Sequence, residues 1–329
     1  MKAAVAAAGA LIALAGCTTH SSVMPAGHVV ELDDVPFFAQ ERYQCGPAAL
    51  ATILVNSGVT VTPEELVSMV YVPERKGSFQ PEIKAAARRY ERLPYELAPD
   101  AQSLFAEIDA GNPVLILQNL FIDRWPRWHY AVVVGYDSER GRILLRSGKQ
   151  ERRVESINSF LRNWRGGKYW AIIALRPGQI PASATAERYV EMIADSEGLV
   201  SASARALALE SGLQEWPDNA NLAFIAANQA RGQGKVVEAA SLYQQALQSQ
   251  PDHLGALNNY SDLLLSESCL SAARVHIETA RRLVDTRSAV YPVILSTANA
   301  IEASGQMHDV GSQCEKLTAY GTADGLRKN

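Results

Sequence analysis

Three residues in the N-terminal half are of types that, if brought together, could attack an amide or ester carbonyl: Cys45, His129 and Gln40. A thiolate is a strong nucleophile, a histidine can take the thiol proton and return it to a leaving group, and a glutamine amide can donate a hydrogen bond to an oxyanion. Gly46-Pro47 and an apolar run follow Cys45, which predicts a buried helix that begins at the cysteine. The free N–H groups and the macrodipole of a helix N-terminus favour the thiolate.

Two segments carry a resemblance to a known family. Gln40-Glu-Arg-Tyr-Gln-Cys-Gly-Pro-Ala-Ala-Leu50 resembles the nucleophile segment of the bacteriocin-processing cysteine peptidases, a papain-like family that cuts leader peptides after a double glycine. His129-Tyr-Ala-Val-Val-Val-Gly-Tyr136 resembles the sequence around the catalytic histidine of that family. The resemblance implies that Cys45 is the nucleophile, that His129 is its base and that Gln40 lies in the oxyanion hole. Taken singly, Cys45 also fits an inert core residue and His129 a structural residue at the start of a strand.

The third catalytic position departs from the family pattern. The family usually carries an aspartate at the end of the next strand to orient the imidazole, and Ser147 stands there in this chain. A serine oxygen can accept the histidine N–H but supplies no negative charge. The nearest carboxylate in sequence, Asp137, lies at the far end of the histidine strand, about 25 Å away at about 3.3 Å per residue. We therefore expect a Cys45/His129 dyad with Ser147 as the orienting group.

Three functions fit such a site. The first is a cysteine peptidase that hydrolyses peptide bonds, and the second is a catalytically weak or inactive peptidase-like module that binds peptides. The missing aspartate keeps the second interpretation open. The third is transamidation, or amide hydrolysis on a non-peptide substrate, by the same dyad. Trp125 and Trp128, in the irregular loop before His129, either line a peptide groove or pack over the sheet as a lid.

The periodicity of residues 29–177 changes from helical to strand-like along the chain. Capping signals and apolar spacing predict helices that begin near 63, 80 and 100, and short apolar runs predict antiparallel strands at 113–117, 129–136, 142–146 and 169–175. Helices first and strands later indicate an α+β domain, which is the papain-like layout.

A helical region follows a Pro- and Gly-containing linker at 178–185. Pro217 and Pro251 are 34 residues apart, the tetratricopeptide repeat (TPR) period, which predicts an all-α TPR solenoid over 186–320. The small or bulky residues that the repeat requires recur at that period: Ala227, Ala239, Tyr243 and Ala246, then Ser261, Ala273, Ile277 and Ala280. Such a solenoid presents a concave face to a protein partner, although a purely structural extension is the alternative.

The N-terminus predicts export. Residues 1–17 resemble a lipoprotein signal peptide whose Leu14-Ala-Gly-Cys17 is a lipobox, which implies cleavage before Cys17 and lipidation of its sulfur; an ordinary signal peptide ending near Ala15 is the alternative. Thr18, rather than Asp, after the cysteine favours an outer membrane location facing the periplasm, with residues 18–28 as a tether. In that oxidising compartment Cys269 and Cys314 either pair or stay free.

The amino-acid composition bears on the number of domains and on the classes of partner and cofactor that the chain can bind. The 329 residues are enough for two domains, and 47% hydrophobic with 20% charged residues is ordinary for a globular chain. The net charge of −4 and the lack of a basic block argue against a nucleic acid partner. The six histidines are scattered without ligand spacing, so we expect no metal and no organic cofactor.

Overall fold

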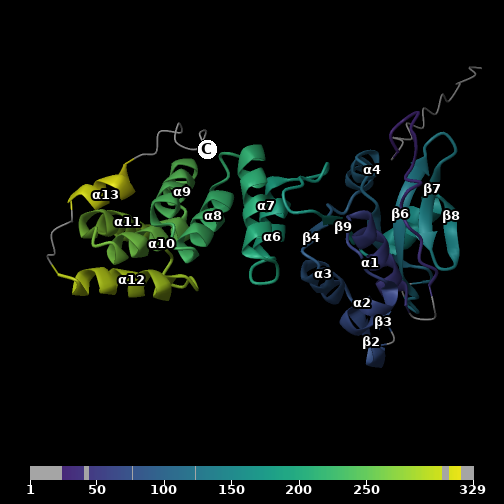
Figure 1. The fold of residues 1–329 in the computed structure, drawn as a ribbon, viewed down its shortest axis with the longest axis horizontal. Coiled ribbons are helices and arrows are strands. Elements are labelled where there is room, and N and C mark those ends of the chain that lie inside the picture. The colour runs from purple at the N-terminus through teal and green to yellow at the C-terminus, as the bar shows by residue number, and fades with distance from the viewer. Residues whose placement is uncertain (1–23, 41–43, 76, 123, 306–310, 320–329) are drawn as a thin grey trace, which may run out of the picture.

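A computed structural model describes residues 24–40, 44–75, 77–122, 124–305 and 311–319 of the chain. The predicted signal peptide and the lipidation site Cys17 lie outside these residues. The N-terminal part is a mixed α/β domain, and the C-terminal part is helical (Figure 1). Among the described residues, no helix combines the length and the apolar character needed to cross a bilayer.

An antiparallel sheet of seven strands forms the N-terminal domain, in the order β4-β9-β5-β6-β7-β8 with β1 paired to β6. Its strands are β1 (Val29–Glu31), β4 (Leu93–Glu96), β5 (Val114–Asn119), β6 (Trp128–Asp137), β7 (Arg142–Ser147), β8 (Gln150–Ser156) and β9 (Ala171–Leu175). A small ribbon of β2 (Tyr71–Val72) and β3 (Gly77–Ser78) lies apart from it.

Helices cover both faces of this sheet. Along β5, Val114 and Ile116 belong to one apolar core, whereas Leu115 and Leu117 belong to another, as the two-residue period of a strand requires. The second core is shared with α1 (Cys45–Asn56), α2 (Pro63–Val70) and α3 (Gln80–Arg89). The first is shared with α4 (Ala101–Asp109) and α5 (Ile157–Gly166).

The expected helices and strands of this domain are present. The helix predicted near residue 63 begins with a complete capping box, in which Thr62 and Glu65 exchange hydrogen bonds. Strand β8 was not expected, because its sequence Gln-Glu-Arg-Arg-Val-Glu-Ser is that of a mostly exposed edge strand without an apolar run.

The C-terminal region is a succession of helices that pack on their neighbours along the chain (Figure 1). They are α6 (Ala186–Ala194), α7 (Ala202–Glu215), α8 (Ala220–Gly232), α9 (Val236–Ser249), α10 (Leu254–Ser266), α11 (Leu270–Leu283), α12 (Tyr291–Ala303) and α13 (Gly311–Thr318). The eight residues that carry the 34-residue pattern in the sequence are all buried to 1% exposure or less. A disulfide between Cys269 and Cys314 ties the start of α11 to α13.

The segment between the two parts is held against the sheet domain. The backbone N–H and the hydroxyl of Ser183 both donate to the carboxylate of Glu107, at 2.7 and 2.6 Å. Helix α6 contacts β4, and its buried Tyr189 belongs to the same apolar core as the sheet. The first helices of the C-terminal region are therefore continuous with the core of the N-terminal domain.

Candidate active site

Cys45 is the first residue of α1, and it is the free cysteine of the described residues. Gln44 before it makes no side-chain capping bond, so that side chain does not satisfy the N–H groups of the first turn. Burial raises the pKa of the Cys45 thiol, and hydrogen bonds from the backbone of Tyr130, Gly46 and Cys45 itself oppose this only in part. The helix terminus alone therefore does not produce a thiolate, and the thiol needs a base.

The imidazole of His129 lies near the start of β6. Its Nε2 is 2.8 Å from the hydroxyl oxygen of Ser147, at the end of the adjacent strand β7. When Nε2–H donates to this oxygen, Nδ1 is the nitrogen free to accept a proton. Burial, and then the charges of Arg153 and Arg127, lower the pKa of His129 to about 4, so the ring is neutral at neutral pH.

Tyr130 connects the thiol to the histidine strand. It directly follows His129, its backbone hydrogen-bonds to Cys45, and the charge of the Cys45 thiolate raises the pKa of its phenol, after the larger effect of burial. Its hydroxyl donates to the carbonyl of Ser78 at 3.2 Å. The sequence pattern did not single out this tyrosine, because it looks like any apolar residue of a buried strand.

Gln40 lies beside the same strand. Its backbone N–H donates to the carbonyl of Gly148 at 3.0 Å, and its side-chain Nε2 is 3.5 Å from the carbonyl of Tyr130. The first bond ties the glutamine segment to the turn after Ser147. The long second contact leaves the amide able to turn toward another acceptor.

One cavity of about 820 Å³ brings three of the four predicted site residues together, since Gln40, Cys45 and His129 all line it. The other described lining residues are Arg75, Gly77, Ser78, Phe79, Gln80, Leu117, Arg127, Trp128, Tyr130, Gly148, Gly167 and Lys168. Ser147 is only 2% exposed and lies behind the imidazole, in the place of an orienting group.

The two tryptophans of the loop before His129 differ in their relation to this cavity. Trp128 lines the cavity and is 53% exposed, whereas Trp125 is not among the lining residues. Asp137 is at the opposite end of β6, hydrogen-bonded to Arg140, and so takes no part in the site.

Glycines allow the backbone to close around this cavity. A Cβ on Gly46, directly after the cysteine, would lie 2.2 Å from the hydroxyl oxygen of Ser78. A Cβ on Gly167 would lie 1.9 Å from the carbonyl oxygen of Leu117. Side chains at either position would force the cavity walls apart.

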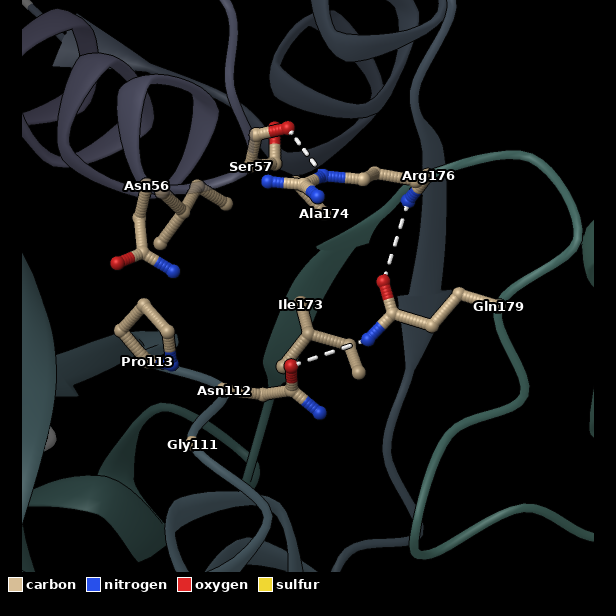
Figure 2. A pocket seen from close by; sticks show the side chains of 10 residues that line it. Asn56, Ser57, Gly111, Asn112, Pro113, Ile173, Ala174, Arg176 and Gln179 are labelled. Carbon is tan, nitrogen blue, oxygen red and sulfur yellow. Dashed lines mark hydrogen bonds between the residues drawn. The ribbon is translucent and has the colours of Figure 1, made fainter.

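A smaller cavity of about 310 Å³ lies at the other end of α1 (Figure 2). Arg176 Nε donates to the carbonyl of Ser57 at 2.8 Å, and Arg92 donates to the same carbonyl at 3.0 Å. Ser57 is the C-terminal cap of α1, so both guanidinium groups stabilise the negative end of that helix. This explains the cluster without a ligand.

No group of three or more His, Cys, Asp and Glu side chains with the arrangement of a metal site occurs in the part of the chain that the structure describes. The residues that line the cavity around Cys45 are instead those of thiol chemistry: a thiol, an imidazole and an amide.

Comparison with known proteins finds similarities to the N-terminal domain. Residues 32–171 match the sequence model of the Peptidase_C39 like family. Among solved structures, the chain is similar to a C39-like peptidase from Bacillus anthracis, with 19% identity over 45% of this chain and 98% of that one and a TM-score of 0.39. No curated protein sequence matches the chain.

Two further solved structures are similar to a slightly smaller share of the chain. One is a double glycine motif protease from an AMS/PCAT transporter in complex with the leader peptide, with 21% identity, 43% and 90% coverage and a TM-score of 0.32. The other is the peptidase domain of Streptococcus ComA, a bifunctional ABC transporter involved in quorum sensing, with 21% identity, 43% and 97% coverage and a TM-score of 0.35. Residues 32–171 are thus similar to C39-like peptidases, and a helical region follows them in the chain.

Proposed function

We propose that this chain is a cysteine peptidase that hydrolyses peptide bonds with Cys45 as nucleophile, His129 as acid and base, and Gln40 as an oxyanion donor. The observation that carries the proposal is the single cavity lined by these three side chains within a C39-like peptidase domain. The double glycine motif protease in complex with a leader peptide adds that a similar protein binds a peptide.

Proton transfer starts the proposed reaction. His129 Nδ1 takes the thiol proton while Nε2–H donates to the Ser147 hydroxyl, which holds the ring in place. The Cys45 sulfur attacks the scissile carbonyl carbon, and the negative charge that forms on the carbonyl oxygen is stabilised by the Gln40 amide and the Cys45 backbone N–H. The imidazolium protonates the leaving amine, which leaves an acyl group on the Cys45 sulfur as a thioester. His129 then takes a proton from a water molecule that attacks the thioester carbonyl, the Cys45 sulfur leaves, and the proton returns from the imidazolium to the thiolate.

Burial of both groups, together with the charges of Arg153 and Arg127 near the imidazole, disfavours proton transfer from Cys45 to His129. A raised thiol pKa and an imidazole pKa of about 4 both favour the neutral pair over the thiolate–imidazolium pair. These two pKa shifts also favour the second candidate, a module that binds peptides without cutting them. The two functions differ in whether the imidazole increases the reactivity of the thiol.

Incubation with a peptide library, read by mass spectrometry, tests the first candidate. We expect cleavage products with the wild-type chain and none with Cys45→Ala or His129→Ala. Gln40→Ala should lower kcat by about 100- to 1000-fold while leaving thiol alkylation unchanged, because the amide acts on the oxyanion and not on the thiol. Binding of peptides without any cleavage would instead support the binding module.

We also propose that the chain is attached to the outer membrane through lipidated Cys17 and that the helical region is a TPR solenoid that binds a protein partner. Support for the solenoid is the burial of the small residues that recur every 34 positions, such as Ala239 and Ala273. Labelling of the full chain with radioactive palmitate, compared with Cys17→Ser, tests the attachment. Recovery of the same partner by the intact chain and by the isolated region would test the solenoid.

A further inference from the structure

The cavity that holds Cys45 lies next to a second one of about 790 Å³. Trp128 and Lys168 line both, so the two cavities adjoin beside the C-terminal end of α5. We define the basic groove as the lining of these two cavities. An extended peptide that passes from one cavity to the other would contact both linings.

Positive charge dominates the described lining of the basic groove. Its cations are Arg75 and Arg127 in the first cavity, Arg162 and Arg165 in the second, and Lys168 in both. All five are exposed, and none has a described carboxylate within salt-bridge distance. No Asp or Glu is among the described lining residues of either cavity.

This charge contrasts with the rest of the chain, which has a net charge of −4. Glu82 lines neither cavity, although its charge raises the pKa of Tyr130 in addition to the larger effect of burial. Arg153, whose charge also reaches His129, is neutralised by an ion pair with Glu155 at 2.8 Å. The groove cations are therefore those available to a ligand, and low-dielectric walls on both sides strengthen their field.

We propose that the basic groove selects an acidic peptide segment, so that the substrate carries Asp or Glu side chains beside the scissile bond. Large apolar side chains would accompany them, because Phe121 and Ile122 are exposed in the wall of the second cavity. The inference rests on the proposed peptidase function, since it names the substrate class of the same site. It does not require that the bond is cut, so binding alone tests it.

Binding to the full chain with Cys45→Ala separates charge from shape. Three fluorescent peptides of equal length and equal apolar content, with Glu, Gln or Lys at the same positions, are titrated at 20 mM and 300 mM NaCl. We expect the Glu peptide to bind about tenfold more tightly than the Gln peptide at low salt, and the Lys peptide to bind least, with the difference shrinking at high salt. The double variant Arg127→Gln/Lys168→Gln should lose most of the preference.

A matched control removes the same charge elsewhere. Arg89→Gln/Arg282→Gln changes two exposed residues that do not line the groove, and we expect it to keep the preference for Glu. Equal affinity for the three peptides, or equal loss in both double variants, would overturn the proposal. Charge-dependent binding to phosphatidylglycerol vesicles without binding of the Glu peptide would also overturn it, in favour of a membrane surface.

Alkylation of Cys45 in the wild-type chain tests the charge of the groove without a peptide ligand and without peptide cleavage. The rate ratio of iodoacetate to iodoacetamide at Cys45, compared with that at glutathione, measures the local potential around the sulfur. We expect a ratio about three- to tenfold higher than for glutathione and a fall toward it in Arg127→Gln/Lys168→Gln. A ratio at Cys45 equal to that at glutathione contradicts the proposal. A raised ratio in a chain that cleaves no peptide contradicts only the peptidase function.

Discussion

Replacing Ser147 with aspartate should increase the reactivity of Cys45. The Ser147 hydroxyl lies 2.8 Å from His129 Nε2 and is almost fully buried, so a carboxylate in its place would meet the imidazolium directly. A carboxylate so close commonly raises a histidine pKa by about 1 to 3 units, after its own desolvation has opposed the gain. Starting from about 4, the pKa of His129 should rise to about 5 to 7.

The rise sets the size of the kinetic effect. Each unit is about 1.4 kcal/mol, so the imidazolium gains about 1.4 to 4 kcal/mol relative to the neutral ring. The population of the thiolate–imidazolium pair therefore grows about 10- to 1000-fold at neutral pH, because the raised pKa of the Cys45 thiol is unchanged. We expect the alkylation rate of Cys45 at pH 7, and kcat/KM for any cleaved peptide, to rise by at least about tenfold.

Two measurements check this prediction. Iodoacetamide labelling followed by mass spectrometry gives the rate at Cys45, and the NMR titration of the His129 ring gives its pKa. Ser147→Asn is the control, since it is similar in size to aspartate but carries no charge. The reasoning is refuted if Ser147→Asp raises the pKa of His129 while the alkylation rate stays at the wild-type value, because the imidazole would then not act on the thiol.

Three further predictions concern stability and geometry. Gly46→Ala should slow alkylation of Cys45 and destabilise the chain by about 1 to 3 kcal/mol, because the added Cβ clashes with Ser78. In the double variant Gly46→Ala/Ser78→Gly, the alkylation rate and the unfolding free energy should both return to the wild-type values, as labelling and urea titration will show. Replacing Cys269 and Cys314 with alanine should cost up to about 4 kcal/mol of unfolding free energy, since the disulfide closes a loop of 45 residues, without changing Cys45 labelling. As the pH is lowered from 6.5 to 4, the unfolding free energy of the wild-type chain should fall by up to about 3 kcal/mol more than that of His129→Gln, because the imidazole has a pKa near 6.5 in the unfolded chain and about 4 in the folded chain. Urea titrations in which the two proteins show the same pH dependence would contradict this.

Local signals in the sequence sufficed for much of the N-terminal domain. The thiol at the start of an apolar helix and the histidine at the start of an apolar strand were both readable from spacing and capping residues. So was Ser147, which stands where the family that the chain resembles usually carries an aspartate, and it lies within hydrogen-bond distance of the imidazole.

The electrostatics of the site could not be read in this way. The helix terminus favours a thiolate at Cys45, but burial by the sheet raises its pKa, and the depth of burial depends on tertiary packing. The low pKa of His129 likewise depends on burial, then on Arg153, which lies on the unexpected edge strand β8, and on Arg127. Lys168 joins the groove through a turn with a left-handed backbone at a non-glycine residue, which no propensity predicts.

The helical region shows the same limit. The 34-residue period pointed to stacked helix pairs, but not to the hydrogen bonds by which Ser183 attaches the segment before α6 to Glu107. Spacing alone also left the pairing of Cys269 with Cys314 open, because a disulfide depends on Cα atoms 5.4 Å apart that only the packing of α13 produces.

The pH dependence of Cys45 alkylation, measured in the wild-type chain and in His129→Ala, tests the central claim most directly. If the imidazole is the base for this thiol, the wild-type rate should exceed that of the variant by at least about tenfold at pH 7, and the two should converge above the pKa of the thiol. Coincident profiles for the two proteins at every pH would contradict the account, because the thiol would then react without help from His129.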